Sequence, residues 1–218
     1  ERIAAGSGKY TQLVAANMVT PPDSRFAINV CTGVSLSDGT ALTAQQVCWW
    51  VGGAMAGAQY NESLTYARYP DAVSVTPALS DTDATEALLD GKLILFEDNG
   101  AVKIEWDINS LTTYTQDISE VYHKNRVIRL CNTIANDLYQ QFSDNFIGVV
   151  DNNEDGRALF KSVIVEYLLE IQSGGGIQNF EADDVEVLQG NDIDSIVINI
   201  AIQPVDAAEK LYITITVS

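Results

Sequence analysis

The last ten residues constrain the fold of this chain more than any other segment. In Glu209–Ser218 apolar and polar or aromatic side chains alternate, which is typical of a strand with one apolar face. The apolar face holds Leu211, Ile213, Ile215 and Val217, and the other face holds Tyr212, Thr214, Thr216 and Ser218. Exposed strand edges promote association. The sequence therefore leaves two alternatives: a final strand in the chain's own sheet, or a strand added to the sheet of another subunit.

Two further β-regions precede this terminal strand. Asp192–Gln203 alternates in the same way, with Ile196, Ile198, Ile200 and Ile202 on one face, and Pro204 ends it. Earlier, the runs Leu93–Glu97 and Val102–Trp106 flank Asp98, Asn99 and Gly100. Asn followed by Gly between two β-prone runs predicts a hairpin.

Two long helices are predicted between these β-regions. Asp117–Phe142 has an apolar stripe at helical spacing, and Asp117 with Glu120 resembles a capping box. Glu154–Ile171 begins after Asn153, a residue type that is favoured at helix N-caps, and ends before the glycines at 174–176. Because about ten residues join the helices, we expect an antiparallel pair.

The first segment, residues 1–91, combines a strand at Phe26–Cys31 with a helix after Thr43 and a second helix at Thr82–Leu89. The stretch Gly39–Asn61 has no charged residue, but its apolar centre spans only twelve residues, fewer than the roughly 20 that cross a bilayer. We therefore expect a buried helix and no membrane insertion.

These elements predict an α+β fold, and the length suits one large domain or two small ones. The first segment, residues 1–91, mixes strands with helices. The second segment, residues 92–218, contains the hairpin, the antiparallel helix pair, the β-strands of a mixed sheet and a terminal strand at 209–217.

The formal net charge of −18 excludes several classes of protein. Such an excess of acids repels phosphate backbones and anionic membranes, so we expect no nucleic-acid partner. At 46% apolar residues the chain is too hydrophobic to be disordered. Three widely spaced cysteines, Cys31, Cys48 and Cys131, favour reduced, buried thiols.

One segment resembles the start of a calcium-binding loop. Asp151, Asn153, Asp155 and Gly156 follow its pattern, but Ser162 stands where a bidentate Glu is required, and Arg157 adds a positive charge. The sequence favours a connection between helices, so we expect no metal site.

No motif supports catalysis or a cofactor. Gly6, Gly8 and Lys9 partly match a phosphate-binding loop, but the first glycine of that motif is missing and Tyr10 replaces Ser or Thr. The single histidine, His123, has no nucleophile motif around it and is predicted to face solvent. We expect a protein that is not an enzyme.

Two clusters of opposite charge suggest a contact between subunits. The basic cluster contains Lys124, Arg126 and Arg129, and the acidic segment contains Asp183, Asp184 and Glu186. Each is compatible with an ordinary solvated surface. In a self-assembling protein, they are also candidates for complementary halves of one interface.

Four stretches in order make the family recognisable: DGTALTAQQVCWWVGGAMAGA from Asp38, SLTYARYPDAVSV from Ser63, TIANDLYQQFSDNFIGVVDNNEDGRALF from Thr133 and EKLYITITV from Glu209. Through these four stretches the chain resembles the later half of the contractile-tail sheath proteins of myophage-type bacteriophages, especially those of PBSX-like prophages.

This resemblance implies a structural role. It implies stacked hexameric rings around a tail tube, a middle domain up to about residue 91 and a C-terminal core domain after it. It also implies partners: other copies of the subunit, the tail tube protein, the baseplate and the tail terminator. The implied location is the virion tail, with assembly in the host cytoplasm.

In that family terminal arms add strands to neighbouring subunits. By resemblance, the donated strand here is Leu211–Val217 and the receiving sheet includes Ile193–Gln203. An isolated half subunit is expected to be monomeric or differently packed. The alternatives are the sheath of a related bacteriocin-like or secretion system, or a small acidic calcium-binding module.

Overall fold

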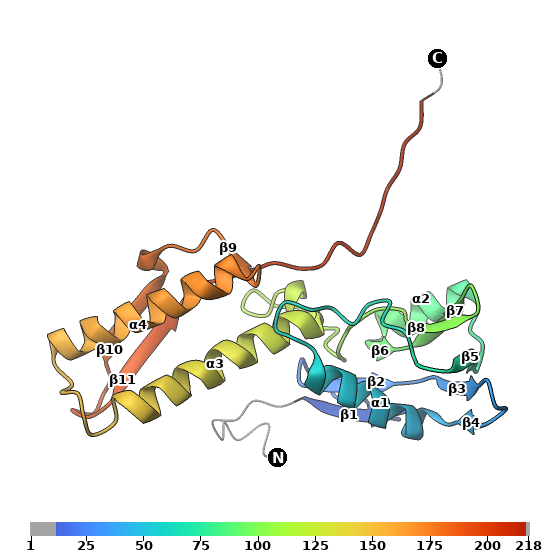
Figure 1. The fold of residues 1–218 in the computed structure, drawn as a ribbon, viewed down its shortest axis with the longest axis horizontal. Coiled ribbons are helices and arrows are strands. Elements are labelled where there is room, and N and C mark those ends of the chain that lie inside the picture. The colour runs from blue at the N-terminus through green and yellow to red at the C-terminus, as the bar shows by residue number, and fades with distance from the viewer. Residues whose placement is uncertain (1–11, 217–218) are drawn as a thin grey trace. The chain divides into compact units, whose positions relative to one another are not determined.

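The computed structural model describes residues 12–216 and divides them into two compact units (Figure 1). We call Gln12–Arg126 with residues 206–216 the sheet unit, and Val127–Val205 the helix-pair unit. Helices and several small sheets together confirm the predicted α+β class. In this described part, no helix has the length and apolar character needed to cross a membrane.

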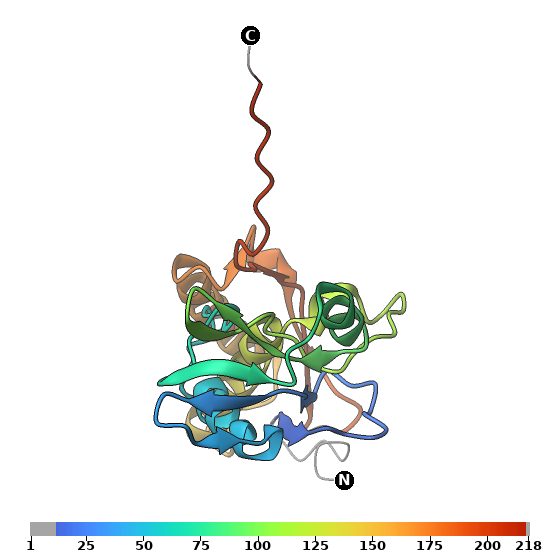
Figure 2. The same ribbon diagram turned by 90° about the vertical axis from the view of Figure 1, so that its right-hand side faces the viewer.

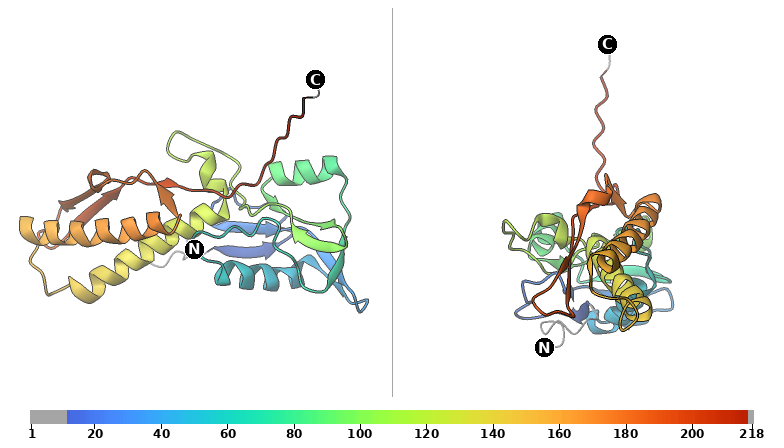
Figure 3. Two further views of the ribbon diagram at one scale, coloured as in Figure 1. Left: turned by 45° about the horizontal axis from the view of Figure 1, so that its top comes forward. Right: turned by 90° about the vertical axis from the view of Figure 1, so that its left-hand side faces the viewer.

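A small parallel sheet forms the centre of the sheet unit. Its strand order is β1 (Leu13–Ala16), β2 (Ala27–Val30) and β6 (Lys92–Leu93). All four residues of β2 are buried, as expected for a central parallel strand covered on both faces. Helix α1 (Ala44–Gly57) runs alongside this sheet (Figure 3) and buries Val47 and Val51.

An antiparallel sheet and a hairpin extend this unit (Figure 2). Strand β3 (Gly33–Leu36) pairs with β4 (Ala41–Leu42) and β5 (Ala72–Thr76). The predicted hairpin is confirmed as β7 (Leu95–Asp98) and β8 (Ala101–Ile104), joined by two residues. Asn99 and Gly100 both have positive φ, 51° and 74°, which matches a type I′ turn.

The predicted division at residue 91 does not coincide with the compact units. Helix α2 (Asp81–Leu89) does end before Gly91, but the chain then continues into the same core. Backbone bonds join Tyr66 and Tyr69 to Ile104 and Val102, at 2.8 Å each. Because the hairpin completes the core of the preceding strands, the units divide at residue 126 instead.

The first long helix begins later than predicted. A short 3₁₀ helix, η1 (Glu120–His123), has Ser119 as its N-cap residue, and α3 (Asn125–Asn145) follows it. Between them Lys124 is extended, with φ −84° and ψ 124°, and forms a β-bridge with Ile108. The prediction of one continuous helix from Asp117 was therefore wrong, because this bridge at Lys124 interrupts the helix.

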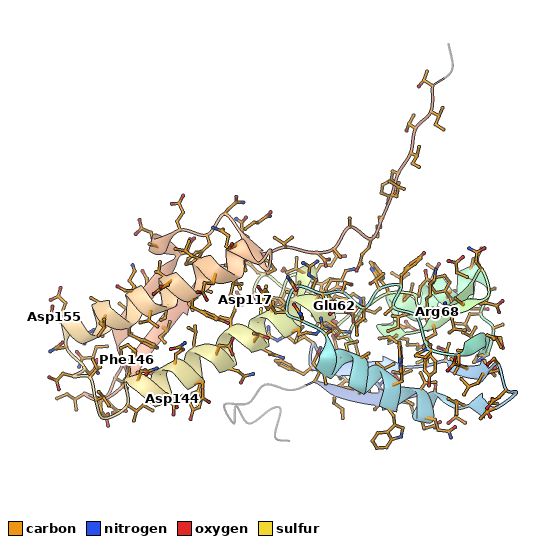
Figure 4. All side chains as sticks on the ribbon, viewed as in Figure 1. Glu62, Arg68, Asp117, Asp144, Phe146 and Asp155 are labelled. Atoms are coloured by element: carbon orange, nitrogen blue, oxygen red, sulfur yellow. The ribbon has the colours of Figure 1, made fainter. Side chains whose placement is uncertain are left out.

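The second helix and the antiparallel packing agree with prediction. Helix α4 (Glu154–Ser173) is capped by Asn153, whose side chain accepts a 2.8 Å bond from the Gly156 amide. Rings of Phe142, Phe146 and Phe160 pack together, with Phe146 and Phe160 centroids 4.5 Å apart. Figure 4 labels Phe146 in the helix-pair unit. Residues near the end of α3 thus meet residues near the start of α4, as in an antiparallel pair.

The strand predicted at Asp192–Gln203 is divided between two partners. Its first part, β11 (Ile196–Ile200), pairs with β10 (Val185–Gln189), which follows the 3₁₀ helix η2 (Ala182–Asp184). Its second part, β12 (Gln203–Pro204), pairs with β9 (Ile177–Gln178). The expected apolar face of β11 is only partly buried, and Ile198 is 36% exposed.

The terminal segment is not a paired strand in this structure. Residues 205–216 belong to no helix or strand, and Val217 and Ser218 lie outside the described residues. Within the described part, the first alternative, a final strand in the chain's own sheet, is therefore wrong. A strand requires a partner, and none of the named strands pairs with residues 211–216.

The phenylalanine cluster gives a stability prediction for the helix-pair unit. Phe160 is fully buried, whereas its neighbour Leu159 is 54% exposed. Phe160→Ala should destabilise the unit by about 3–5 kcal/mol because it leaves a cavity between the helices. Leu159→Ala is the matched control and should change the stability by about 0.5 kcal/mol. Urea unfolding monitored by circular dichroism measures both; equal losses would contradict the packing described here.

Candidate functional site

The carboxylate of Glu209 fixes the start of the terminal segment to the sheet unit. Its side chain is only 8% exposed. Its Oε1 accepts hydrogen bonds from the hydroxyls of Ser63 at 2.9 Å and Thr65 at 2.7 Å. Its Oε2 accepts from the Trp106 indole and from the Lys124 ammonium. We call these five residues the anchor; a carboxylate with four donors is strongly held.

The ring of Trp106 lies close to two lysine ammonium groups. The Lys124 ammonium lies 4.2 Å from the centroid of the Trp106 ring, and the Lys210 ammonium lies 4.9 Å from it. Both distances are within the range of cation–π attraction. Lys210 follows Glu209 directly, so two consecutive residues of the segment contact the same indole.

A second layer of hydrogen bonds holds the donors of the anchor in place. The Thr65 hydroxyl accepts a 3.0 Å bond from the Asp107 amide, and the buried Asp107 carboxylate accepts from the Leu64 amide at 3.0 Å. The other Asp107 oxygen accepts a 2.9 Å bond from Asn125, which is fully buried. The loop before β5 and the residues after β8 are thus joined where Glu209 binds.

The environment of Glu209 favours its charged form. Burial by itself would raise the pKa of the carboxyl group, but hydrogen bonds from Lys124, Thr65 and Trp106 and the Lys124 charge outweigh it. The pKa of Glu209 therefore lies below its ordinary value of 4.5. At neutral pH the anchor contains a buried ion pair.

Immediately beyond the anchor the chain loses all burial. Leu211 is 82% exposed, Tyr212 88%, Ile213 72% and Ile215 82%. We call residues 211–216 the arm. The arm leaves the sheet unit as an extended segment (Figure 2), and its side chains extend into open space (Figure 4). Neighbouring large apolar side chains at this exposure are typical of segments that bind a partner.

Open space flanks the anchored segment on both sides. A hollow of about 450 Å³ lies beside Trp106, His123, Lys124 and Glu209, and another of about 380 Å³ lies beside Ser63, Thr65, Arg126 and Glu209. Ala207 and Ala208 contribute to both. The segment contacts the sheet unit through the side chains of Asp206, Glu209 and Lys210, with open space beside Ala207 and Ala208.

The predicted basic cluster is not a free surface patch. Lys124 is paired with Glu209, its side chain is 15% exposed, and Asp206 lies 3.9 Å away. Arg126 is buried and Arg129 is partly buried. Of the acidic residues, Asp183 and Glu186 are exposed, while Asp184 caps η2. Lys124 is therefore paired within its own chain, and the charge contact between subunits stays a prediction.

His123 is buried and does not face solvent as predicted. It is 7% exposed, and its Nδ1 lies 2.6 Å from the Leu111 carbonyl oxygen. A carbonyl only accepts, so Nδ1 carries the proton. Burial lowers the pKa of His123 below 6.5. The Trp106 and Tyr114 rings meet the imidazole edge to face, so its surroundings are those of a core residue.

The other motifs acquire structural explanations. The segment that resembles a calcium loop joins α3 and α4, and the Arg157 guanidinium donates to both oxygens of Asn152 at 3.1 Å. No group of three or more metal-binding side chains occurs in residues 12–216. The partial phosphate-binding motif at Gly6–Lys9 lies outside the described residues. Cys31, Cys48 and Cys131 are free thiols, partly buried.

Sequence reasoning identified the arm but missed the anchor. Glu209 is bonded to residues 85 to 146 positions away, and no periodicity reports such a contact. The available signal was an isolated Glu–Lys pair directly before a segment with no charged side chain.

Comparisons with known proteins agree on one family. A model of the phage tail sheath protein central domain matches residues 2–110, and a model of the phage tail sheath C-terminal domain matches residues 117–218. The phage-like element PBSX protein XkdK of Bacillus subtilis (strain 168) is 36% identical over 227 residues, which cover 100% of this chain and 48% of that protein. The chain thus spans about half the length of the curated relatives it matches.

Solved structures show the same fold. The sheath tail protein from Desulfitobacterium hafniense is 39% identical, with a TM-score of 0.86 over 97% of this chain and 50% of that one. The contracted helical sheath of the anti-feeding prophage is similar at 13% identity, with a TM-score of 0.74 over 99% of this chain and 64% of that one. The second likeness concerns the fold alone.

The anchor predicts a specific dependence of stability on pH. A lowered carboxyl pKa stabilises the folded state fully above the unfolded pKa of about 4.3, and this contribution is lost as the pH falls through the folded pKa. Glu209→Gln should therefore cost about 2 kcal/mol at pH 7 and progressively less below about pH 4.5. Urea unfolding at pH 7, 5, 4 and 3 measures the difference from wild type.

The matched control is Glu97→Gln, the same change at an exposed carboxylate on β7. It should alter the free energy of unfolding by about 0.5 kcal/mol or less at each pH. A loss in Glu209→Gln that stayed constant from pH 7 to pH 3 would contradict the ion pair.

Proposed function

Because this chain belongs to the phage tail sheath family, we propose that it is part of a contractile tail sheath subunit that works by self-association. The observation that carries this proposal is the anchored, exposed arm. Residues 211–216 have alternating apolar side chains and no strand partner in the described chain, so they are suited to strand addition.

The edge of β11 is the receiving edge in this proposal. Strand β11 has only β10 as a neighbour in the described residues, so its other edge is unpaired. Val197 and Ile198 on β11 are 45% and 36% exposed. Natural edge strands usually carry charges that prevent association. Here neither Ile196–Ile200 nor Leu211–Ser218 contains a charged side chain, although the chain has a net charge of −18.

A hollow next to β11 supports the same assignment. A space of about 620 Å³ lies beside Phe142, Phe146, Ile193 and Ile196 in the helix-pair unit. Ile193 is 85% exposed there. Apolar side chains of an added strand would gain burial against these residues, which is the main driving force for association.

Strand addition suits an assembly whose subunits change position. Backbone hydrogen bonds join two strands with little dependence on their side chains, so the link persists while the folded units rotate as rigid bodies. We propose that subunits linked in this way form stacked hexameric rings and contract by such rearrangement. No nucleotide or metal takes part, and the protein is structural and not an enzyme.

The proposed partners follow from this role. They are further copies of the subunit, the tail tube protein, the baseplate and the tail terminator. The proposed location is the tail of a phage virion or a related contractile particle, with assembly in the host cytoplasm. A bacteriocin-like or secretion sheath is the alternative, because the fold is shared with the anti-feeding prophage sheath.

Removal of the arm tests this proposal. Deletion of residues 211–218 from the full-length subunit should abolish tubular polymers and leave a folded, soluble protein, because residues 211–216 are exposed and lie outside the hydrophobic core. Negative-stain electron microscopy and sedimentation measure the outcome. Normal sheaths from the truncated subunit would contradict strand donation.

Substitutions within the arm separate its two faces. Ile213→Asn with Ile215→Asn should raise the concentration required for assembly by about 100-fold, because each buried isoleucine contributes about 1.5 kcal/mol or more. Thr214→Asn with Thr216→Asn is the matched control on the opposite face and should assemble at nearly the wild-type concentration. Equal defects in both double variants would contradict burial of the isoleucine face.

A further inference from the structure

The environment of the chain changes abruptly between Glu209 and Leu211. The Glu209 side chain is 8% exposed and accepts four hydrogen bonds, whereas Leu211 is 82% exposed. Two hollows lie beside Ala207, Ala208 and Glu209, and within this stretch the four hydrogen bonds of Glu209 hold the start of the arm.

We propose that the Glu209–Lys124 anchor is a positioning device that fixes the point and direction at which the arm leaves its subunit. This inference rests on the proposed strand donation and names the residues that control it. The donated strand would then begin at a fixed attachment point on the sheet unit. The edge strand that accepts it would find the start of the donated strand in one defined position.

The energetic reason is the entropy of the arm. A strand tethered through a freely moving linker must lose the conformational freedom of that linker when it pairs, about 1–2 kcal/mol for each backbone residue that becomes ordered. Residues 206–210 are already held by Glu209 and Lys210 before any partner binds. Preorganisation of this kind strengthens association without any new contact.

Lys124 is the appropriate position for a test because it lies outside the segment. Lys124→Met removes the charged donor and leaves the sequence of residues 206–218 unchanged. Glu209 would then be a buried carboxylate without its cation, which is unfavourable, so the segment should leave the anchor. Lys124→Arg retains a cationic donor and is the matched control.

Release of the segment can be measured by proteolysis in the soluble full-length subunit. Trypsin cleaves after Lys210, whose ammonium contacts Trp106 in the anchored state. Lys124→Met should accelerate loss of the last eight residues about tenfold, because cleavage follows the population of the open segment. Lys124→Arg should remain close to wild type, and mass spectrometry identifies the fragment.

Assembly is the second measurement. Lys124→Met should form few or irregular tubular polymers at concentrations at which wild type and Lys124→Arg form regular ones. If Lys124→Met does not fold, Glu209→Ala is the second variant, since it changes the segment and leaves the folded donors intact. An unchanged rate of cleavage in Lys124→Met, or wild-type polymers from either released variant, would overturn this inference.

Comparison with the truncated subunit distinguishes the two proposals. If the subunit lacking residues 211–218 forms normal sheaths, strand donation itself is wrong. If that truncation abolishes sheaths while Lys124→Met releases the segment and still assembles normally, strand donation stands and only the positioning role is wrong.

Discussion

The arrangement of the terminal segment depends on one buried charge. A carboxylate removed from water is costly unless donors replace the lost solvent, and Glu209 has Ser63, Thr65, Trp106 and Lys124 in that role. These donors come from the loop before β5, the end of β8 and the residue between η1 and α3. The same extended conformation at Lys124 that interrupts the predicted helix therefore presents its ammonium to Glu209.

A buried ion pair adds little net stability compared with an apolar replacement, whereas removal of one partner is costly. An apolar residue in place of Glu209 would bind the hollow beside Trp106 in many orientations, whereas four donors around one carboxylate define a single one. Under the proposed strand donation, this defined orientation matters because the residues that follow Glu209 would pair with another molecule. It matters less for the folded sheet unit, whose core of Ile28, Val51, Leu93 and Ile104 is complete without the segment.

Local patterns predicted the elements that depend on local interactions. The Asn99–Gly100 hairpin, the Asn153 cap and the antiparallel helix pair follow from turn chemistry, capping and periodicity, and each is present. Predictions failed where a distant contact decided the outcome. His123 is buried where the Leu111 carbonyl oxygen accepts a hydrogen bond from its Nδ1, and the helix predicted from Asp117 is interrupted where Lys124 pairs with Ile108 and binds Glu209, 85 positions later.

The terminal strand therefore has the predicted alternation but no partner in the described residues, so its pairing stays a prediction, for a physical reason. Alternation records which face of a segment is apolar, but a strand exists only when a second backbone satisfies its hydrogen bonds. In residues 211–216 the apolar face is present and the second backbone is absent from the described chain. Such a segment needs a second strand from elsewhere. A subunit that carries both an unpaired arm and an uncharged, unpaired β11 edge in its described residues is suited to a pairing of arm and edge that repeats from copy to copy.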